Sequence, residues 1–443
     1  TRVSGVMTNA PVMLNVDCDM FVNNPDVVLH AMCLLIGFDN VQMSGFVHLL
    51  RRDCKDSRAP STKAQGVSTE GKSYMEKPPI IWKGTEEQNY VEKKESAAEI
   101  ITSTTQSPKT AAAIKGLTAT VAAAKQVASC TYELNTCWGK EVGWAYGTLT
   151  EDIQTGLRIH SLGWKSVALD TNPPAFLGSA PVGGPASMTQ YKRWCTGLLE
   201  TLVGRNSPIT ATLTKDLGFR QCLAYLLINT WSLRSVPELC YALLAPFCVF
   251  SNTTFLPMAS EPMLVILVLL LVSYNVYTLT EYLVCGLSVR AWWNNQRMER
   301  IHWTSASLFG LLCVVMKVLG MSQTTFEVTA KEQNKSTGSD AEEDPGRFTF
   351  DSSPLFIPGT VIVLLNLAAL VVGSLKVMGS LSGMNYSKGT GIGELVCSAW
   401  VVVGFCPFLK GLFGKGRYGI PWPTIAIGSV LSSLFLLICK WTS

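Results

Sequence analysis

Apolar residues are distributed unevenly along the 443-residue chain. Residues 1–220 mix apolar and polar positions, as a globular domain does, whereas residues 221–443 contain long apolar runs. A helix needs about 20 apolar residues to cross a bilayer, and five of these runs are long enough. The pattern therefore predicts a mixed N-terminal domain followed by a membrane region. The predicted spans are 236–256, 263–286, 355–378, 392–413 and 423–441.

A sixth apolar segment, 303–320, is shorter than the others. Basic residues favour the cytosolic side of a membrane. With 1–220 in the cytosol, a crossing at 303–320 would place the basic loop at 410–417 outside. We therefore expect 303–320 to be an interfacial helix, so that the loop lies inside. The tryptophans expected at headgroup level are Trp292, Trp293 and Trp303.

Three glycosylation sequons give a second, weaker argument for this topology. Those at Asn252 and Asn385 lie outside in the five-span arrangement, and the one at Asn334 lies inside. Such sequons also arise often by chance.

Composition narrows the class of protein. Only 15% of the residues are charged, against about 25% in ordinary soluble domains. The net charge of +4 gives no reason to expect nucleic acid as a partner. The 14 cysteines are scattered without paired CxxC spacing, which argues against a zinc site. The chain begins at Thr1 without a visible signal peptide, and we expect its natural N-terminal region to be missing.

An apolar stretch, 11–16, runs into two carboxylates, Asp17 and Asp19. Residues two apart in an extended chain point to the same side. Carboxylate oxygens in this arrangement suit Mg²⁺ or Mn²⁺, which can bridge a diphosphate. A single Asp-x-Asp is common, so a solvated turn at a strand end remains the alternative.

The sequence Thr150-Glu151-Asp152 precedes a helical apolar pattern. A carboxylate at a helix start can act as a general base toward a sugar hydroxyl. The alternative is an ordinary helix cap formed by the Thr150/Asp152 region.

Residues 190–194 read Gln-Tyr-Lys-Arg-Trp. Arg193 can bind a diphosphate through its planar fork, and the indole of Trp194 can face the apolar side of a sugar ring. Taken singly, the motif is also compatible with an ordinary amphipathic cytosolic helix.

The order of these motifs, followed by membrane spans, resembles the processive family-2 glycosyltransferases, in particular the plant cellulose-synthase-like proteins. The strings 17–37, 137–152 and 170–200 are similar to the B/H group of that superfamily, and most of all to the H group. Residues 326–331, Phe-Glu-Val-Thr-Ala-Lys, resemble the gating loop of the family.

The resemblance implies an α/β cytosolic GT-A-type domain over 1–220 and an all-α transmembrane bundle over 221–443, with the gating loop at 321–350. It also implies roles for residues at matching positions. Asp17 and Asp19 would hold the metal and the UDP diphosphate, and Asp152 would be the base of an inverting transfer. The residues implied in donor or acceptor binding are Glu151, Gln190, Arg193, Trp194, Thr329 and Lys331.

The implied function is transfer of glucosyl units from UDP-glucose to a growing β-glucan, and the H-like strings favour a mixed (1,3;1,4) linkage. The implied location is the Golgi membrane or the plasma membrane, with a homo-oligomer left open. A non-processive membrane glycosyltransferase, an inactive scaffold and a transporter remain alternatives. The sparse ionisable residues in the apolar runs argue against ion-coupled transport.

Residues 47–95 depart from the family pattern. The stretch 60–76 resembles the family sequence only after a shift of one nucleotide, so we interpret it as a wrong reading frame beside a missing segment. Residues 53–95 are rich in Lys, Glu, Ser and Thr without periodicity, which predicts a disordered loop. A natural surface insertion is the alternative. The aspartate that the family carries upstream of Asp17 and its N-terminal membrane helices are also missing.

Overall fold

The computed structural model describes part of the chain, which forms two compact units. The first contains the described residues within 1–57, 75–179 and 206–223, and the second contains those within 180–205 and 224–443. The described residues are 12–15, 20–36, 44–49, 51–53, 80–83, 145, 147–169, 171–178, 181, 183–257, 261–321, 347–381 and 392–442.

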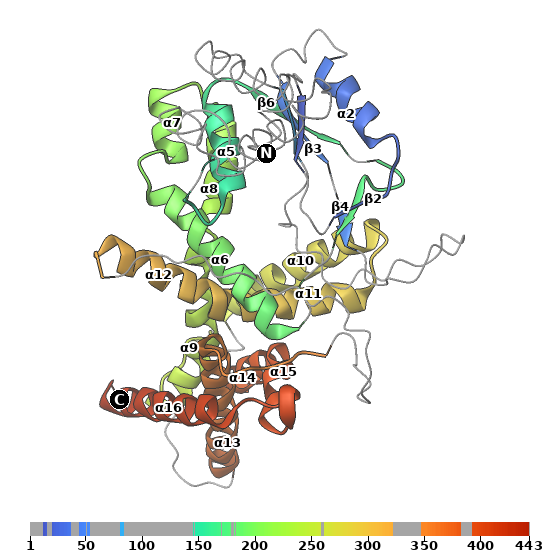
Figure 1. Ribbon diagram of the computed structural model, residues 1–443. Coiled ribbons are helices and arrows are strands. Elements are labelled where there is room, and N and C mark those ends of the chain that lie inside the picture. The colour runs from blue at the N-terminus through green and yellow to red at the C-terminus, as the bar shows by residue number, and fades with distance from the viewer. Residues whose placement is uncertain are drawn as a thin grey trace, which may run out of the picture. The chain divides into compact units, whose positions relative to one another are not determined.

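A four-stranded mixed sheet lies in the first unit, with the strand order β1-β5-β3-β6 (Figure 1). Strands β3 and β6 are parallel, whereas β5 runs antiparallel to both β1 and β3. Strand β5 falls within 53–95, where the sequence predicted no regular structure. Its residues Ile80, Ile81 and Trp82 favour extended structure, and the composition of the whole segment hides them. The strands are β1 Val12–Asn15, β3 Ser44–Leu49, β5 Ile80–Lys83 and β6 Lys165–Leu169.

A second, three-stranded sheet has the order β2-β7-β4, with β7 antiparallel to β2 and parallel to β4. Helix α2 belongs to the same packing. Its Val27 and Ala31 form a buried apolar cluster with Ala175 and Phe176. The elements are β2 Phe21–Val22, α2 Val27–Ile36, β4 Arg51–Asp53 and β7 Phe176–Gly178.

Two helices complete the first unit, α5 (Glu151–Ser161) and α7 (Pro208–Thr214). They contact one another, and the N–H of Asp216 donates to the Ser161 carbonyl at 3.1 Å. The described part of this unit combines helices with mixed sheets, as an α/β domain does. The GT-A fold itself stays a prediction, because residues 84–144 lie outside the described residues.

The second unit is helical and is organised around α13, which packs against α9, α14 and α16. Asn366 of α13 is fully buried, and its side-chain amide donates to the carbonyls of Ala242 and Ile362 at 3.0 and 2.9 Å. Helix α8 (Phe219–Asn229) begins in the first unit and ends in the second. The other helical elements of the second unit are α6 Gly184–Val203, η2 Trp231–Arg234, α9 Ser235–Ser251, α10 Pro262–Val284, α11 Val289–His302, the π-helical turn η3 Trp303–Ser307, α12 Leu308–Val318, η4 Pro354–Phe356, α13 Ile357–Leu381, α14 Ile392–Gly404, α15 Cys406–Leu412, η5 Gly416–Tyr418 and α16 Trp422–Thr442.

The described residues contain five helical stretches long and apolar enough to cross a membrane, and a sixth if one bent pair counts as a span. The bent pair is α14 and α15, which meet at 77° and cover the predicted span 392–413. Several helices expected from the apolar pattern are therefore present. The unbroken stretches are Trp231–Ser251, Pro262–Val284, Val289–Val318, Pro354–Gly379 and Gly416–Trp441.

The predicted interfacial segment 303–320 is the second half of the long helix Val289–Val318. Its first half, α11, carries four charged side chains. Length and apolar composition alone would allow this helix to cross a membrane. Its interfacial position therefore stays a prediction, as do the bounds of the two domains and of the other spans.

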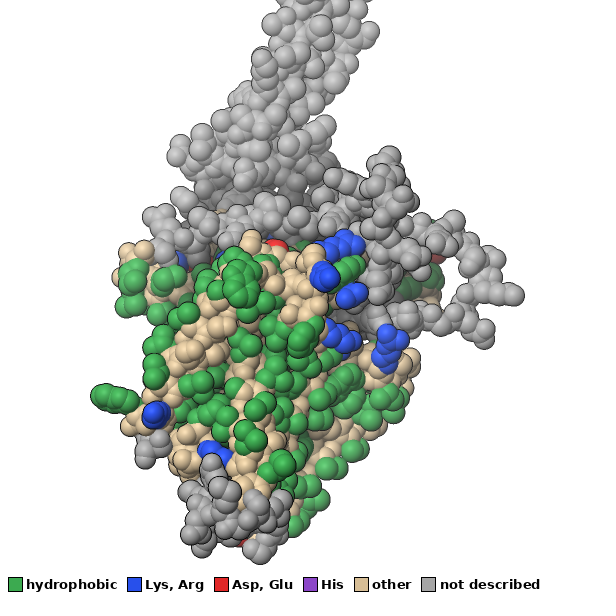
Figure 2. Space-filling model, turned by 90° about the horizontal axis from the view of Figure 1, so that it is seen from below, with side chains coloured by type: hydrophobic (Ala, Val, Ile, Leu, Met, Phe, Trp, Pro, Cys, Tyr) green, Lys and Arg blue, Asp and Glu red, His purple; other side chains and the backbone are tan. Residues whose placement is uncertain are grey.

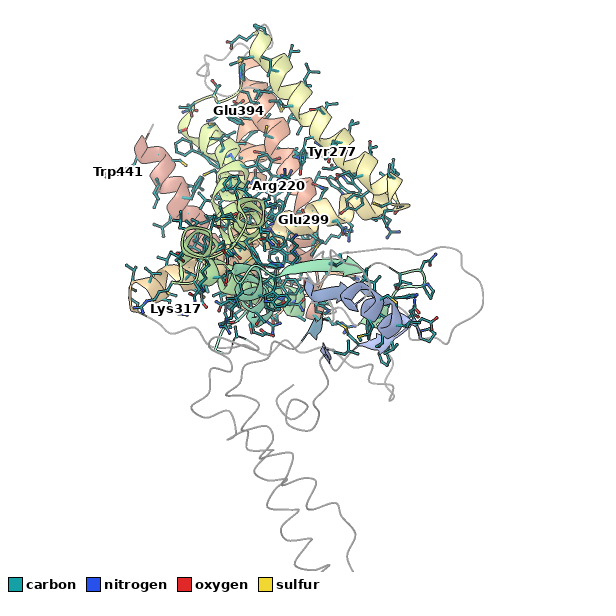
Figure 3. The ribbon with its side chains drawn as sticks, turned by 90° about the horizontal axis from the view of Figure 1, so that it is seen from above. Arg220, Tyr277, Glu299, Lys317, Glu394 and Trp441 are labelled. Atoms are coloured by element: carbon teal, nitrogen blue, oxygen red, sulfur yellow. The ribbon has the colours of Figure 1, made fainter. Side chains whose placement is uncertain are left out.

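Helix α10 differs from the other long helices because no residue within it is buried. Figure 3 shows its side chains, Tyr277 among them, projecting from the helix into open space. Hydrophobic side chains also dominate the described part of the face seen in Figure 2. Such large exposed apolar surfaces are expected where a protein meets lipid or another apolar partner.

Candidate active site

The predicted metal-binding carboxylates Asp17 and Asp19 lie outside the described residues. Strand β1, which precedes them, ends at Asn15. Among the residues that the structure does describe, no group of three or more His, Cys, Asp or Glu side chains could hold a metal ion. Thr329 and Lys331 of the predicted gating loop are also outside the described part of the chain.

Glu151 and Asp152 occupy the first turn of α5, as the sequence predicted. Backbone N–H groups at a helix start are without intrahelical acceptors, and the helix dipole favours negative charge there. The Thr150 side chain makes no capping hydrogen bond. Instead, Thr155 fixes the turn, since its hydroxyl accepts from the Ala145 N–H at 2.9 Å and donates to the Glu151 carbonyl. Asp152 is thus a half-buried carboxylate on a fixed helix start.

Gln190, Arg193 and Trp194 lie on α6, a 20-residue helix. Residues three and four apart share one face of a helix, so the three side chains lie together. Gln190 and Trp194 are only 8% and 6% exposed. The structure therefore brings these three predicted residues together on α6, which belongs to the second unit, whereas Asp152 belongs to the first.

The start of α6 lies against the end of the predicted gating loop 321–350, of which residues 321 and 347–350 are described. The N–H of Gly184 donates to the Thr349 hydroxyl at 3.2 Å. A Cβ atom at Gly184 would lie 2.3 Å from the Thr349 carbonyl oxygen, so no larger residue fits. Gly183 has a φ of 85°, which also favours glycine. The sequence Gly183-Gly184 is therefore needed for the close approach of this segment to α6.

Tyr191, the residue after Gln190, anchors α6 to the long helix. Its ring stacks on His302 at 4.7 Å and on Trp231 at 5.7 Å between centroids. Its hydroxyl accepts a hydrogen bond from the indole N–H of Trp303 at 3.2 Å. Burial raises the pKa of Tyr191 far above its ordinary value, so the hydroxyl stays protonated. Trp303 therefore makes a specific polar contact to α6.

Cys195 continues this contact one turn further along α6. Its thiol lies 3.2 Å from the Ser307 hydroxyl, and its carbonyl accepts from the Ser232 hydroxyl at 2.6 Å. Gly310 of α12 faces the same point, because a Cβ atom there would lie 2.9 Å from the Cβ of Cys195. An ion pair between Lys317 and Glu200 at 2.8 Å extends the contact between the two helices.

The sequence analysis did not identify Tyr191, His302 or Ser307 as functional positions. Two sequence features could have pointed to these positions. One is the aromatic residue inside the Gln-x-x-Arg-Trp motif, and the other is the run of small residues Thr304–Ser307. A π-helical turn such as η3 often marks a functional site, but it is invisible in the sequence.

Together, the α/β unit, the candidate membrane spans and the helix that carries Gln190, Arg193 and Trp194 fit the class of membrane-embedded enzymes that the motifs indicated. The chain belongs to the cellulose synthase family, whose profile matches residues 1–59 and 55–442. The family resemblance predicted from the motifs is thus confirmed.

Individual relatives agree with this assignment. Cellulose synthase-like protein H2 of Oryza sativa subsp. japonica is 46% identical over 482 aligned positions, which cover 99% of this chain and 62% of the relative. Cellulose synthase-like protein H1 of the same plant is 44% identical, covering 99% of this chain and 63% of the relative. Cellulose synthase-like protein B3 of Arabidopsis thaliana is 36% identical, covering 98% and 62%. The expected similarity to the B and H groups is confirmed, and the chain spans about three fifths of these relatives' length.

The comparisons also bear on the anomalous region 47–95. The family profile matches in two pieces that meet at residues 55–59. The alignment to the H2 relative has 482 positions against 443 residues here, so at least 39 of its positions have no counterpart in this chain.

Proposed function

We propose that this chain is the larger part of a membrane glycosyltransferase that elongates a cell-wall β-glucan from UDP-glucose. Membership of the cellulose synthase family carries this proposal. The shared face of Gln190, Arg193 and Trp194 on a buried, well-anchored helix supports it, because a diphosphate and a sugar ring need donors and an aromatic surface held in place.

Asp152 is the proposed base. It takes the proton of the acceptor hydroxyl while that oxygen bonds to the anomeric carbon of the donor glucose. The bond between this carbon and the diphosphate breaks at the same time, and UDP leaves with inversion. Its place in the first turn of α5 suits the role, because the helix dipole favours the ionised carboxylate that a base requires.

Donor binding is assigned to the remaining motif residues. Asp17 and Asp19 would bind Mg²⁺ or Mn²⁺ through carboxylate oxygens, a donor set that suits these cations. The metal, when bound, neutralises charge on the leaving diphosphate. Gln190 and Arg193 would contact the diphosphate, and Trp194 would support the acceptor sugar. Glu151, Thr329 and Lys331 are assigned to substrate binding on the motif match alone.

The direct test uses microsomes that contain the full-length protein and labelled UDP-glucose. Asp152→Asn is expected to lower incorporation into polymer by about 10²–10⁴-fold, the usual contribution of a general base. Asp216→Asn is the matched control, since Asp216 is an exposed carboxylate in the same unit and its backbone hydrogen bond would remain. Unchanged incorporation by Asp152→Asn would refute the assignment of the base.

Product analysis and location test the finer parts of the proposal. The identity to H proteins, at 44–46%, exceeds that to B proteins, at 35–37%, and favours the mixed (1,3;1,4) linkage expected from the H-like strings. Digestion of the product with lichenase should then release short oligosaccharides, and a resistant product would exclude this linkage.

A fluorescent fusion should mark the Golgi membrane, with the plasma membrane as the alternative. The catalytic domain is expected to face the cytosol.

A second candidate is an inactive scaffold, and the divided family match near residues 55–59 favours it. Sequencing the transcript across 47–95 tests this possibility. A frame that restores the positions missing relative to the H proteins should give an active enzyme in the microsomal assay. If the transcript encodes the present residues and the protein is inactive, the scaffold is supported.

A further inference from the structure

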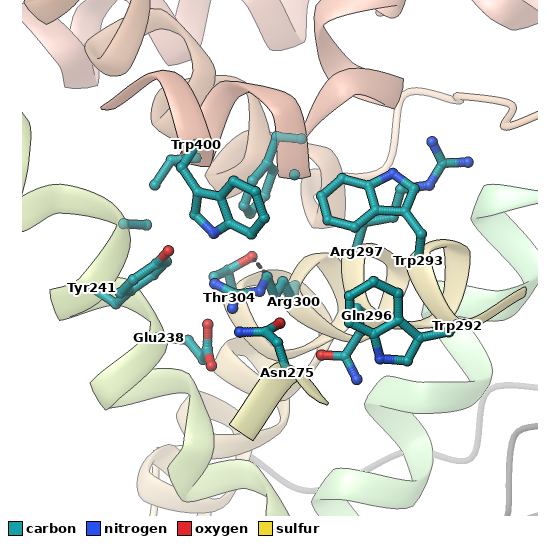
Figure 4. Close-up of a pocket in the computed structure, with 14 residues that line it drawn as sticks. Glu238, Tyr241, Asn275, Trp292, Trp293, Gln296, Arg297, Arg300, Thr304 and Trp400 are labelled. Carbon is teal, nitrogen blue, oxygen red and sulfur yellow. Dashed lines mark hydrogen bonds between the residues drawn. The ribbon is translucent and has the colours of Figure 1, made fainter. Parts of the chain in front are cut away.

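A narrow pocket lies between α9, α10, α11 and α14, and Thr304 of η3 also lines it (Figure 4). The pocket is narrow inside and open on one side. Figure 4 shows side chains from all four helices converging on it, with Trp400 opposite Arg300 and Asn275. The pocket is therefore a meeting point of four helices, and the proposed reaction gives it no role.

Three indole rings form one wall of this pocket. Trp293 lies 5.5 Å from Trp400 in an edge-to-face arrangement and 6.3 Å from Trp292 between centroids. The N–H of Trp292 donates to the Thr278 hydroxyl of α10 at 3.1 Å. Tryptophan is enriched where a membrane protein meets the lipid headgroups, since its ring is apolar and its N–H is polar.

Two guanidinium groups lie on the same pocket. The Arg297 guanidinium donates to the side-chain Oδ1 of Asn294 at 3.1 and 2.6 Å and to the Cys406 sulfur at 3.1 Å. Arg300 lies over the Tyr241 ring, 4.8 Å from its centroid. Glu238 is the acidic residue of the lining, so the charged side chains of the pocket sum to one positive charge. This balance attracts an anion more than a neutral ligand.

The pocket continues onto an apolar surface, because Asn275, one of its lining residues, belongs to α10. No residue of α10 is buried, and the half of this helix before Ser273, from Met263 to Val272, is entirely apolar, whereas its second half also carries polar residues and Glu281. A charged group at the pocket and a hydrocarbon chain along α10 could therefore belong to one amphiphilic molecule.

We propose that this pocket binds the headgroup of an anionic phospholipid, with its acyl chains along α10. The phosphate would meet Arg297 and Arg300, and the three tryptophans would flank the glycerol backbone. Basic pockets between membrane helices are known to select anionic lipids. A saccharide would also suit indole rings and amides, but the net positive charge, the narrow interior and the apolar surface of α10 favour the lipid.

The proposal does not depend on glycosyltransferase activity, so binding is its readout. Full-length protein in neutral phosphatidylcholine nanodiscs would be titrated with fluorescent phosphatidylglycerol. The double variant Arg297→Gln/Arg300→Gln should bind this lipid about 25-fold more weakly, at about 5-fold per arginine near a membrane surface. Arg290→Gln is the matched control, because Arg290 is an exposed residue of the same helix that does not line the pocket.

Competition on the unmodified protein keeps the proposal testable if the double variant does not fold. Unlabelled phosphatidylglycerol should displace the probe, and phosphatidylcholine should not. Equal displacement by phosphatidylcholine would overturn the proposal. Displacement by glycerol 3-phosphate would identify a site for a free anion, and displacement by cellotetraose would identify a saccharide site. Either of these results would also overturn it.

Discussion

At the scale of single residues, the structure shows how the helix that carries the Gln-x-x-Arg-Trp motif is held in place, which the motif alone does not predict. The pattern predicted that Gln190, Arg193 and Trp194 act together, and the helix places them on one face. It could not predict that Tyr191 stacks on Trp231 and His302, because these residues lie 40 and 111 positions away in the chain. Pairings of this kind depend on tertiary packing, which local periodicity does not contain.

Tyr191 allows a graded test of this anchor. Tyr191→Phe removes only the acceptor of the Trp303 N–H, which should lower stability by about 0.5–1.5 kcal/mol. Tyr191→Ala also removes the ring between Trp231 and His302, and we expect a loss of about 3–5 kcal/mol. Thermal unfolding in detergent measures both. Tyr274→Phe, at an exposed tyrosine of α10, should have no effect, and equal effects of all three variants would contradict the anchor.

Cys195 provides a chemical test of the same packing. Burial raises the pKa of its thiol to about 12, so it stays neutral at pH 8. Only about one molecule in ten thousand then carries the reactive thiolate. Iodoacetamide at pH 8 should label the exposed Cys33 of the native protein and leave Cys195 unlabelled until denaturant is added. Peptide mass spectrometry reads both sites, and rapid native labelling of Cys195 would show that α6 and η3 are apart in solution.

At the scale of whole elements, the presence of several long apolar helices could be predicted, because a run of about 20 apolar residues has few other stable forms in a membrane protein. The break between α14 and α15 was not predicted. The sequence analysis expected one continuous span over 392–413, whereas the structure bends it by 77°. Gly404 and Pro407 flank the bend, and proline is tolerated at the start of the new helix α15. The apolar pattern continues through this break and so conceals it.

The close approach of α6 and α12 predicts the effect of a single methyl group. Gly310→Ala places a Cβ atom 2.9 Å from the Cβ of Cys195, which should cost about 1–3 kcal/mol as the helices separate. Gly404→Ala is the contrasting variant, because no atom lies within 4 Å of the added carbon. It should be neutral or slightly stabilising. The measurement is the melting temperature of each variant. Similar melting temperatures for Gly310→Ala and Gly404→Ala would show that α6 and α12 do not approach so closely.

At the scale of the whole molecule, the sequence indicated an α/β domain joined to a membrane region. The described residues form an α/β unit and a helical unit, while the domain boundary expected at residue 220 stays a prediction. Helix α6, at 184–203, belongs to the helical unit, and the chain then returns to the first unit at 206–223. The expected boundary came from the start of long apolar runs, and this pattern contains no information on α6, whose mixed surface packs on η3 and α12.

Membrane topology is a prediction at this scale. If 303–320 is interfacial, the C-terminus at Ser443 lies outside, and a glycosylation acceptor tag fused there should be modified. If Val289–Val318 crosses the membrane, the same tag stays in the cytosol and remains unmodified. A tag inserted within 322–346 should give the opposite result in each case. Sensitivity of the gel mobility to endoglycosidase H measures both, and a modified internal tag would refute the interfacial helix.

The π-helical turn at Trp303–Ser307 has a consequence for the length of the chain itself. A π turn holds one residue more than an α turn between the same two ends. Deleting one of its small residues would restore a regular α-helix. The two ends of the turn would keep their places, so the side chains of α12 would keep their directions and Gly310 would still face Cys195. A deletion in the regular turn just before Gly310 would instead rotate every later side chain by about 100°. Homologous chains that keep this contact can therefore lose a single residue at the π turn more readily than within α12 itself.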